Sequence, residues 1–566
     1  MDRNMKYGIY GINRVSKDFI YIFNMLNIVC FYEDTAMENP FGFEMVYGVE
    51  CAVQYKKVCD RIIICDFHKE QKKKKLISLG LAYGEDFVYE KDFFHLLDRE
   101  LNFSEGSDIV VWGTGKRAND FCVWNKKYNV KYFIDTNKQS EEYNNCEIKA
   151  PSDIADWGKL YIIIAAAKDH DIVDFLEKKG LKKYENYINS QELIVLPSKL
   201  LEETIFDSNC YELTCNTMLN HLEILSGGSA FCCCTTFMKL GIGSIEQNTV
   251  KEIWNSSIHK IMCLSAVNKT YTFCKKDMCP LFIGRHGDKG IINLKEAYQA
   301  MCESPQNSII GFDSTCNLKC ETCRHGLYVA AGKELEDNQR YADIIKKELL
   351  PDLKFLVMAG DGEVFASQTY KDIYSSAEME HLQWIRLLSN GMLFNEKKWR
   401  EFSKGKKAKI MLTASIDAAV KDTYESIRKN GNFDILKKNM EFASKLRKTG
   451  ELSYFRINFV VQKKNYREIL DFVKWGMELE ADEVFFTKVL NWGTYTQEEF
   501  LDISMMEEDG ITPKPELEVL LDNPIMNHRI VDLGTIRYAH KVDELEKIDN
   551  YYKWELERKV PDLFKS

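Results

Sequence analysis

The C-terminal half of the chain alternates short apolar runs with amphipathic stretches six times. The apolar runs cover residues 308–312, 355–358, 384–388, 410–414, 455–461 and 484–488, and helical stretches such as 341–350 and 466–479 lie between them. Strands that alternate with helices predict a parallel sheet built from βαβ units. Because ligands bind at the carboxyl ends of such strands, we expect functional residues directly after each run.

The N-terminal third contains two copies of one pattern: strand, glycine loop, helix, strand ending at an acid, apolar strand, helix and Gly-Leu. The first repeat covers residues 6–100 and the second repeat covers 108–196. In the second repeat, Gly113-x-Gly115 with Asp135 downstream fits a nucleotide-binding fingerprint, in which glycines admit a phosphate and the acid binds ribose hydroxyls. The first repeat has Asn13 at the second glycine position, so we expect weaker binding there. The pair resembles Rossmann-like domains attached to surface-polysaccharide enzymes, and a docking unit without a nucleotide is the alternative.

Three cysteines follow the first apolar run of the C-terminal half with the spacing C-x3-C-x2-C: Cys316, Cys320 and Cys323. Three thiolates can hold three irons of a cubane cluster and leave the fourth iron open, whereas electron-carrying clusters use four cysteines. A zinc site is the alternative, with His325 as the fourth ligand. The loop resembles that of the radical S-adenosylmethionine (SAM) enzymes. The resemblance implies that the open iron binds SAM and that an electron from the cluster cleaves it to methionine and a 5′-deoxyadenosyl radical.

Polar motifs after the next strands resemble those of the same family and stand in the same order. Residues 360–363, Gly-Asp-Gly-Glu, are similar to a Gly-Gly-Glu motif whose acid receives the amino group of SAM, with Asp361 in place of the second glycine. The resemblance implies that the serine after the fourth strand reaches the ribose and that the following arginine reaches the SAM carboxylate. The predicted SAM-binding residues are therefore Gly360, Gly362, Glu363, Ser389, Asn390, Ser415 and Arg428.

A second cysteine-rich segment lies upstream, between residues 212 and 282. It contains Cys215, the triplet 232–234 after a Gly-Gly turn, an Ile-Trp-Asn-Ser stretch at 253–256, and Cys274-x4-Cys279 before a proline. It resembles the SPASM domain, which binds auxiliary iron–sulfur clusters and usually follows the radical core, whereas here it precedes the core. The resemblance implies an auxiliary [4Fe–4S] cluster on Cys215, Cys233, Cys274 and Cys279. Cys232 and Cys234 compete with Cys233, and four thiolates also suit a structural zinc.

Composition places these motifs in a multidomain globular chain of 566 residues with a net charge of −10. The charge argues against a nucleic-acid surface, no apolar run is long enough to span a membrane, and no signal segment opens the chain. Eighteen cysteines without export signals indicate reduced thiols in an anaerobic or microaerobic cytoplasm. The lysine run at residues 72–75 is predicted to be a solvated helix face.

Together these patterns predict an α/β fold with a partial (β/α)6 TIM-like barrel as its radical SAM core. The expected domains are the two Rossmann-like units (1–105 and 106–200), a SPASM-like domain (205–290), the core (300–495) and a capping tail (496–566). We expect an enzyme with two [4Fe–4S] clusters and SAM, reduced by a partner such as flavodoxin or ferredoxin. The glycine loops favour a carbohydrate or nucleotide-sugar substrate that is oxidised, epimerised or dehydrated. A peptide- or protein-modifying maturase and a non-catalytic binding module are the alternatives.

Overall fold

The chain forms two compact units in the computed structural model. The first unit consists of residues 1–211 with 255–273, and the second of residues 212–254 with 274–566. The structure describes residues 5–35, 46–98, 108–124, 128–136, 138, 140–166, 170–183, 185–190, 197–211, 215–238, 240–276, 279–283, 304–324, 326–358, 360–491 and 494–536. The end of the predicted capping tail, 537–566, and His325 lie outside the described residues.

The second unit is built on one sheet of ten strands in the order β14-β13-β12-β15-β16-β17-β18-β19-β20-β21. Its strands are β12 His221–Leu225, β13 Ser229–Phe231, β14 Gly243–Ser244, β15 Asn307–Gly311, β16 Phe355–Met358, β17 Trp384–Ser389, β18 Lys409–Ser415, β19 Tyr454–Val461, β20 Glu483–Lys488 and β21 Val531–Asp532. From β12 through β15 to β21 every neighbouring pair is parallel. The six predicted strands are β15 to β20, each within one residue at either end, and the predicted α/β class with a parallel sheet is confirmed.

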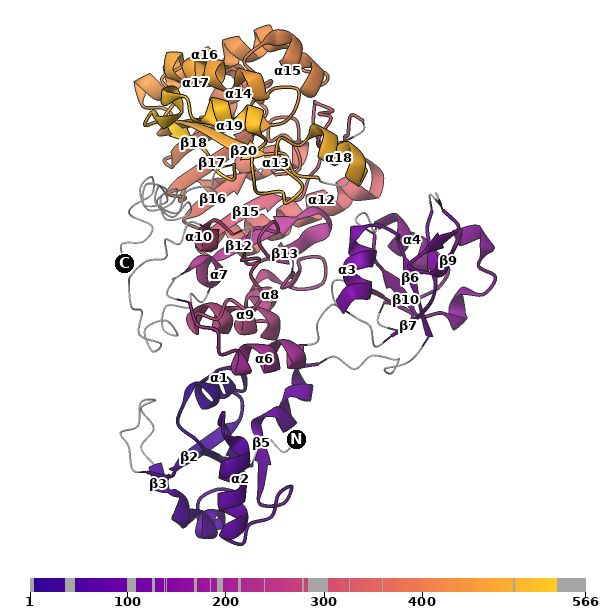
Figure 1. Cartoon of the computed structure of the whole chain (residues 1–566), viewed down its shortest axis with the longest axis vertical. Helices are drawn as coiled ribbons and strands as arrows, with labels where there is room; N and C mark the ends of the chain where they lie inside the picture. The colour runs from indigo at the N-terminus through magenta and orange to yellow at the C-terminus, as the bar shows by residue number, and fades with distance from the viewer. Residues whose placement is uncertain are drawn as a thin grey trace. The chain divides into compact units, whose positions relative to one another are not determined.

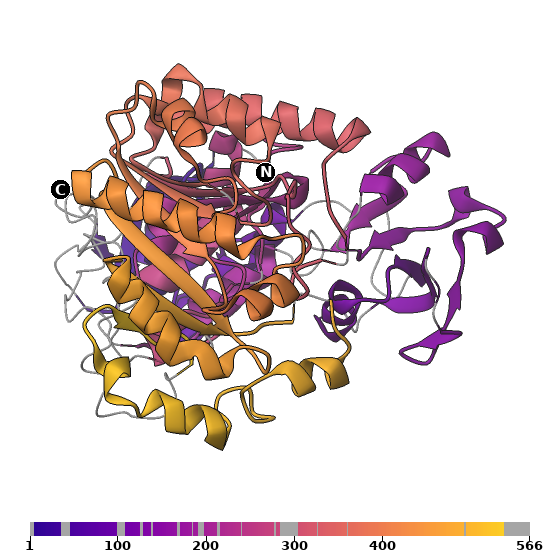
Figure 2. The same ribbon diagram turned by 90° about the horizontal axis from the view of Figure 1, so that it is seen from above.

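Helices follow the strands of this sheet and lie around them, as Figures 1 and 2 show. They are α12 Gly332–Ile344, α13 Gln368–Tyr374, α14 Glu396–Ser403, α15 Lys421–Ile427, α16 Phe433–Thr449, α17 Ile469–Glu478, α18 Gln497–Ile503 and α19 Pro515–Leu521. Asn395 and Asn432 cap the first turns of α14 and α16, and Gly450 ends α16 in the left-handed conformation. The helix predicted over 341–350 is the end of α12, which continues as a π turn over Ile345–Leu349.

The first unit contains two parallel sheets with the same strand order. The first is β3-β2-β1-β4-β5 and the second is β11-β10-β6-β7-β9-β8, in which only β8 is antiparallel. Order 3-2-1-4-5 is that of a doubly wound sheet, whose ligands bind beyond the carboxyl ends of the central strands. The strands are β1 Lys6–Tyr10, β2 Asn27–Glu33, β3 Val46–Gly48, β4 Arg61–Ile64, β5 Phe87–Tyr89, β6 Asp108–Trp112, β7 Asn129–Ile134, β8 Glu142–Tyr143, β9 Cys146–Lys149, β10 Ile162–Ile164 and β11 Tyr187–Asn189.

Helices of the first unit include one after the glycine loop of each repeat. Those of the repeats are α1 Arg14–Ile22, α2 Lys69–Ser78, α3 Lys116–Trp124 and α4 His170–Lys178, and α6 Pro197–Phe206 and α9 Ser257–Val267 follow. The remaining described helices, α7 Thr217–Asn220, α8 Val250–Trp254 and α10 Pro280–Ile283, belong to the second unit. Within the described part of the chain, none of the helices has the length and apolarity that crossing a membrane requires.

Candidate functional site

The three-cysteine loop begins directly after β15 and is held by hydrogen bonds from its own polar residues. The Asp313 carboxylate accepts the Thr315 N–H at 2.8 Å and the Ser367 hydroxyl at 2.5 Å. The Cys316 N–H donates to the Tyr328 carbonyl at 2.9 Å. These hydrogen bonds therefore fix the start of the loop, around Cys316, at the carboxyl end of β15.

Each of the three thiols accepts a hydrogen bond from a different residue. The amide nitrogen of Asn390 lies 3.7 Å from the Cys316 sulfur, Arg428 Nη1 lies 3.7 Å from the Cys320 sulfur, and Arg324 Nε lies 3.4 Å from the Cys323 sulfur. Two of these donors, Arg428 and Arg324, are cationic, and the thiolate is the form of cysteine that binds metal. Cys316 also accepts the Leu318 N–H at 3.5 Å. Sequence motifs give the cysteines but not these donors.

Burial acts in the opposite direction on two of the thiols. It raises the pKa of Cys316 and of Cys320, while the Arg428 guanidinium works to lower the pKa of Cys320. Burial disfavours a charged thiolate that has no compensating partner. A bound metal supplies that compensation, and metal binding then releases the thiol protons.

Glu363 is fully buried behind this loop, and its carboxylate accepts hydrogen bonds from residues at the end of β17. It takes the Ser389 hydroxyl at 2.8 Å, the Asn390 N–H at 2.7 Å and the Phe365 N–H at 3.3 Å. Burial raises the pKa of Glu363, and the hydrogen bonds from Asn390 and Ser389 oppose that shift. The structure thus brings together the predicted residues of two successive strand ends.

Gly362 lies where the Gly-Asp-Gly-Glu turn crosses the cysteine loop. A Cβ atom at this position would be 2.2 Å from the Asp313 carbonyl oxygen and 2.8 Å from the Thr315 carbonyl oxygen. Gly360 packs against Gly311, whose Cα would be 3.6 Å from a Cβ on Gly360. Asp361, which replaces a glycine of the resembled motif, is absent from the described non-glycine residues with positive φ, so the turn accepts a side chain there.

Arg428 lies at the end of α15 and forms a buried ion pair with Asp417, 2.6 Å between Nη2 and Oδ2. The charge of Asp417 raises the pKa of Arg428 against the effect of burial. Ser415, the last residue of β18, pairs in register with Asn458 of β19. Arg428 therefore has two partners within the protein, Asp417 and the Cys320 sulfur, which sequence reasoning did not predict.

Of the four cysteines predicted to hold the auxiliary cluster, Cys215 lies near enough to the other three to raise the pKa of each. Burial, followed by the neighbouring Cys215 thiol and then by Cys234, Cys232 and Cys274, raises the pKa of Cys233. Burial and then the Cys215 thiol raise the pKa of Cys279 to about 12. Cys232 instead contacts the Met238 sulfur at 3.7 Å. Among the described residues no three His, Cys, Asp or Glu side chains are arranged around a single metal ion.

Strand β12 connects this cysteine-rich segment with the sheet that carries the three-cysteine loop. It pairs with β15 from His221–Asn307 to Leu225–Gly311, and the Ser226 hydroxyl after it lies 3.4 Å from the Ser314 hydroxyl and 3.2 Å from an Asp361 carboxylate oxygen. Sequence reasoning missed this strand, although Leu222 and Ile224 alternate with polar residues, which is a strand signal. The cysteine-rich segment upstream of the core therefore adds β12 to the core sheet, next to the strand β15 that leads into the three-cysteine loop.

The glycine loop of the second repeat has the geometry that its sequence pattern predicts, but its acid has a partner. Gly113 has a φ of 122°, and a Cβ there would be 2.7 Å from the Ala165 carbonyl oxygen. A Cβ on Gly115 would have no atom within 4 Å. The Thr114 hydroxyl donates to Asp135 at 2.5 Å. Phosphate binding at this loop stays a prediction.

One prediction for the first repeat is wrong at a single residue. The lysine run at 72–75 was expected to be a solvated helix face, but Lys72 is only 6% exposed and pairs with Glu33 at 2.7 Å. The neighbouring Lys74 is exposed, as predicted. The difference arises because α2 turns position 72 toward the strand ends, a direction that a run of identical residues does not reveal.

Comparison with known proteins gives one family match. Residues 215–280 match the SPASM family, described as an iron–sulfur cluster-binding domain. No curated protein matches the chain. The match confirms the predicted resemblance of the upstream cysteine-rich segment to a SPASM iron–sulfur domain, and the three-cysteine loop on a parallel βα sheet agrees with the predicted resemblance to radical SAM enzymes.

Solved structures similar to this chain include SuiB from Streptococcus suis bound to S-adenosylmethionine, with 17% identity and a TM-score of 0.27 over 36% of this chain and 47% of that one. SuiB bound to its precursor peptide SuiA matches with 16% identity and a TM-score of 0.26, over 36% and 46% of the two chains. The anSMEcpe protein with bound AdoMet matches with 21% identity and a TM-score of 0.26, over 33% and 52%. The chain thus spans about half the length of these relatives.

Proposed function

We propose that this protein is a radical SAM enzyme whose SAM-binding cluster is held by Cys316, Cys320 and Cys323. The observation that supports this most is the set of three separate donors, Asn390, Arg428 and Arg324, each directed at one of the three sulfurs. Hydrogen bonds to the sulfurs are one of the means by which proteins tune iron–sulfur clusters. When bound, the cluster supplies the electron that cleaves SAM and so starts hydrogen abstraction from a substrate.

The residues around the loop support distinct roles in binding SAM. Glu363 is fixed by Ser389 and Asn390, and a carboxylate in this position suits the ammonium group of SAM. Ser415 is the last residue of β18 and is proposed to contact the ribose. Arg428 was predicted to bind the SAM carboxylate. Its contacts with Asp417 and Cys320 also support a role in fixing the second sulfur.

For the auxiliary site we propose a [4Fe–4S] cluster on Cys215, Cys233, Cys274 and Cys279. The SPASM match covers all four, and their thiols lie close enough to influence one another's pKa. Cys232, which contacts Met238 and lies near Cys274, and Cys234, which lies near Cys279, are the alternatives to Cys233. A low-potential protein such as flavodoxin or ferredoxin is the proposed electron donor.

For the substrate, the contacts favour a peptide or protein over a carbohydrate. A peptide or protein substrate is the class that the SPASM resemblance implies, and the SPASM segment supplies β12 beside the three-cysteine loop. The carbohydrate alternative depends on the glycine loops of the repeats. The acids that would take sugar hydroxyls there already have partners within the chain, Glu33 with Lys72 and Asp135 with Thr114.

The proposed chemistry is tested by incubating anaerobically reconstituted protein with dithionite and SAM. We expect 5′-deoxyadenosine from the wild type and from Cys51→Ala, an exposed cysteine of the first repeat, and none from Cys320→Ala. Continued formation of 5′-deoxyadenosine after all three loop cysteines are replaced would refute the assignment. The substrate class follows from deuterium transfer into 5′-deoxyadenosine, compared between deuterated peptides and deuterated nucleotide-sugars.

A further inference from the structure

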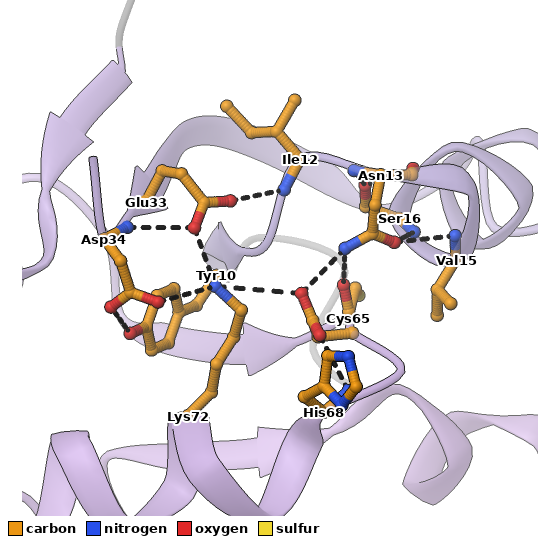
Figure 3. A network of polar contacts seen from close by, with 11 residues as sticks. Tyr10, Ile12, Asn13, Val15, Ser16, Glu33, Asp34, Cys65, His68 and Lys72 are labelled. Atoms are coloured by element: carbon orange, nitrogen blue, oxygen red, sulfur yellow. Dashed lines mark hydrogen bonds and ion pairs between the residues drawn. The ribbon is translucent and has the colours of Figure 1, made fainter. Parts of the chain in front are cut away.

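The carboxyl ends of β1, β2 and β4 in the first repeat surround a single ammonium group (Figure 3). This ammonium belongs to Lys72 of α2. Its Nζ lies 2.7 Å from Glu33 Oε1, 3.3 Å from Asp34 Oδ2 and 3.7 Å from Asp66 Oδ2. In a sheet with this strand order, the region beyond these strand ends is where a nucleotide binds. The acid at the end of the second strand, here Glu33, is the one that would take ribose hydroxyls.

The other polar groups of the region are also engaged within the protein, as Figure 3 shows. The Nζ of Lys72 lies 4.0 Å from the centre of the Tyr10 ring, whose hydroxyl donates to Asp34. Ile12 N–H donates to Glu33 at 2.9 Å, and the Asn13 amide donates to Asp66 at 2.8 Å. An ammonium over an aromatic face and between carboxylates is well stabilised when it is desolvated.

The carboxylates around Lys72 favour its protonated form. Burial alone would lower the pKa of Lys72, but the hydrogen bond to Glu33 and the charges of Glu33, Asp66 and Asp34 together raise it. The Lys72 side chain is 7% exposed and that of Glu33 is 12% exposed. The ammonium is therefore a permanent charge at this place under neutral conditions.

The second repeat has different residues at the corresponding positions. Gly80 and Gly180, which end α2 and α4, both have positive φ, and counting back from them aligns Lys72 with Ile172 and Asp66 with Ala166. Ile172 is buried in an apolar cluster with Trp112 and Leu176. Gly115 stands where the first repeat has Asn13, and a Cβ on it would meet no atom within 4 Å. The second repeat therefore has no ammonium at the position of Lys72 and no amide at that of Asn13, and its Arg117 guanidinium donates to the Ala166 carbonyl at 2.9 Å instead.

We propose that Lys72 is a built-in ligand of the first repeat: its ammonium occupies the nucleotide position, so this repeat is complete without a bound small molecule. The cation offsets one of the three negative charges of Glu33, Asp34 and Asp66 and reduces the repulsion among them, and the negative charge that is left disfavours a phosphate. The first repeat then serves as a structural module, and the carboxylates around Lys72 select a primary ammonium.

Chemical rescue tests this in the full-length protein. Lys72→Ala removes the side chain beyond Cβ, and n-propylammonium has the same atoms as the missing part. Hydrogen–deuterium exchange of peptides covering 6–13 and 27–34 should become about tenfold faster in Lys72→Ala, as loss of a buried partner predicts. Millimolar n-propylammonium should restore protection, whereas n-propanol should not. Lys74→Ala, on the exposed side of the same helix, is the matched control and should exchange like the wild type.

If Lys72→Ala does not fold, two other measurements test the role of Lys72. Lys72→Met keeps the length of the stem without the charge, and adding Glu33→Gln to it should recover part of the lost protection, because one unpaired charge is removed. In the wild type, NAD⁺ and UDP-glucose should leave the exchange of both peptides unchanged. Protection of these peptides by either nucleotide, or equal rescue by n-propanol and n-propylammonium, would overturn the proposal.

Discussion

At the residue scale, Gly362 is the tightest point of the candidate site. A methyl group there would lie 2.2 Å from the Asp313 carbonyl oxygen, so Gly362→Ala must move the turn that carries Glu363 away from the cysteine loop. We expect 5′-deoxyadenosine formation to fall by about a hundredfold, since small displacements of binding groups cost that much. Gly326→Ala is the control in the same loop, because a Cβ there meets no atom within 4 Å. Equal activity of the two variants would show that the turn is not constrained.

Lys72 gives a prediction for pH dependence. Its pKa is raised in the folded chain by Glu33 and the neighbouring carboxylates, which outweigh burial. A raised pKa means that the stabilising contribution is fully present below the unfolded value of about 10.4 and is lost as pH rises through the folded pKa. The exchange difference between the wild type and Lys72→Met should therefore stay constant from neutral pH to about 10 and shrink above it. A difference that shrinks between pH 7 and pH 9 would contradict the shift.

At the element scale, β12 is the unexpected member of the core sheet. Leu222 on this strand is fully buried, and its carbonyl accepts the Ser308 hydroxyl of β15 at 2.7 Å. Leu222→Ala should cost about 2–5 kcal/mol of stability, the usual range for a large buried side chain. Urea denaturation and hydrogen exchange of β15 peptides measure the loss.

The control for β12 is Leu327→Ala, because Leu327 is 55% exposed. It should change stability by less than about 0.5 kcal/mol. Because β12 lies between Cys215 and Cys233, Leu222→Ala should also lower the iron retained by the upstream cysteines. Unchanged iron with a large loss of stability would mean that the auxiliary site folds independently of the strand.

At the scale of the whole molecule, the two groups of cysteines should hold separate clusters. Replacing Cys316, Cys320 and Cys323 by alanine should leave about four irons per chain, the content of one four-cysteine cluster. Adding Cys233→Ala should remove them, while adding Cys210→Ala, an exposed thiol, should not. Metal analysis after anaerobic purification decides the outcome. Zinc in place of iron would contradict the auxiliary cluster and leave a structural site.

Local patterns in the sequence determined the six core strands, their parallel arrangement and the three cysteines that follow the first of them. Each of these follows from hydrophobic periodicity or from residues within a few positions of one another, and both are properties of a short segment. The same reasoning failed at Lys72, because four consecutive lysines carry no sign of which one faces the strand ends. It also missed β12, a short strand whose partner lies far along the chain.

The tertiary structure alone decided which distant residues meet at the site. Asn390 reaches Cys316 across 74 positions and Arg428 reaches Cys320 across 108. Lys72 meets Glu33 across 39 positions, and β12 joins β15 with 86 positions between Leu222 and Ser308. Such contacts depend on strand order and on the direction of each side chain after the chain has closed long loops, and no local propensity encodes either. The sequence by itself therefore determined which chemical groups are available, and the fold decided which of them act on one another.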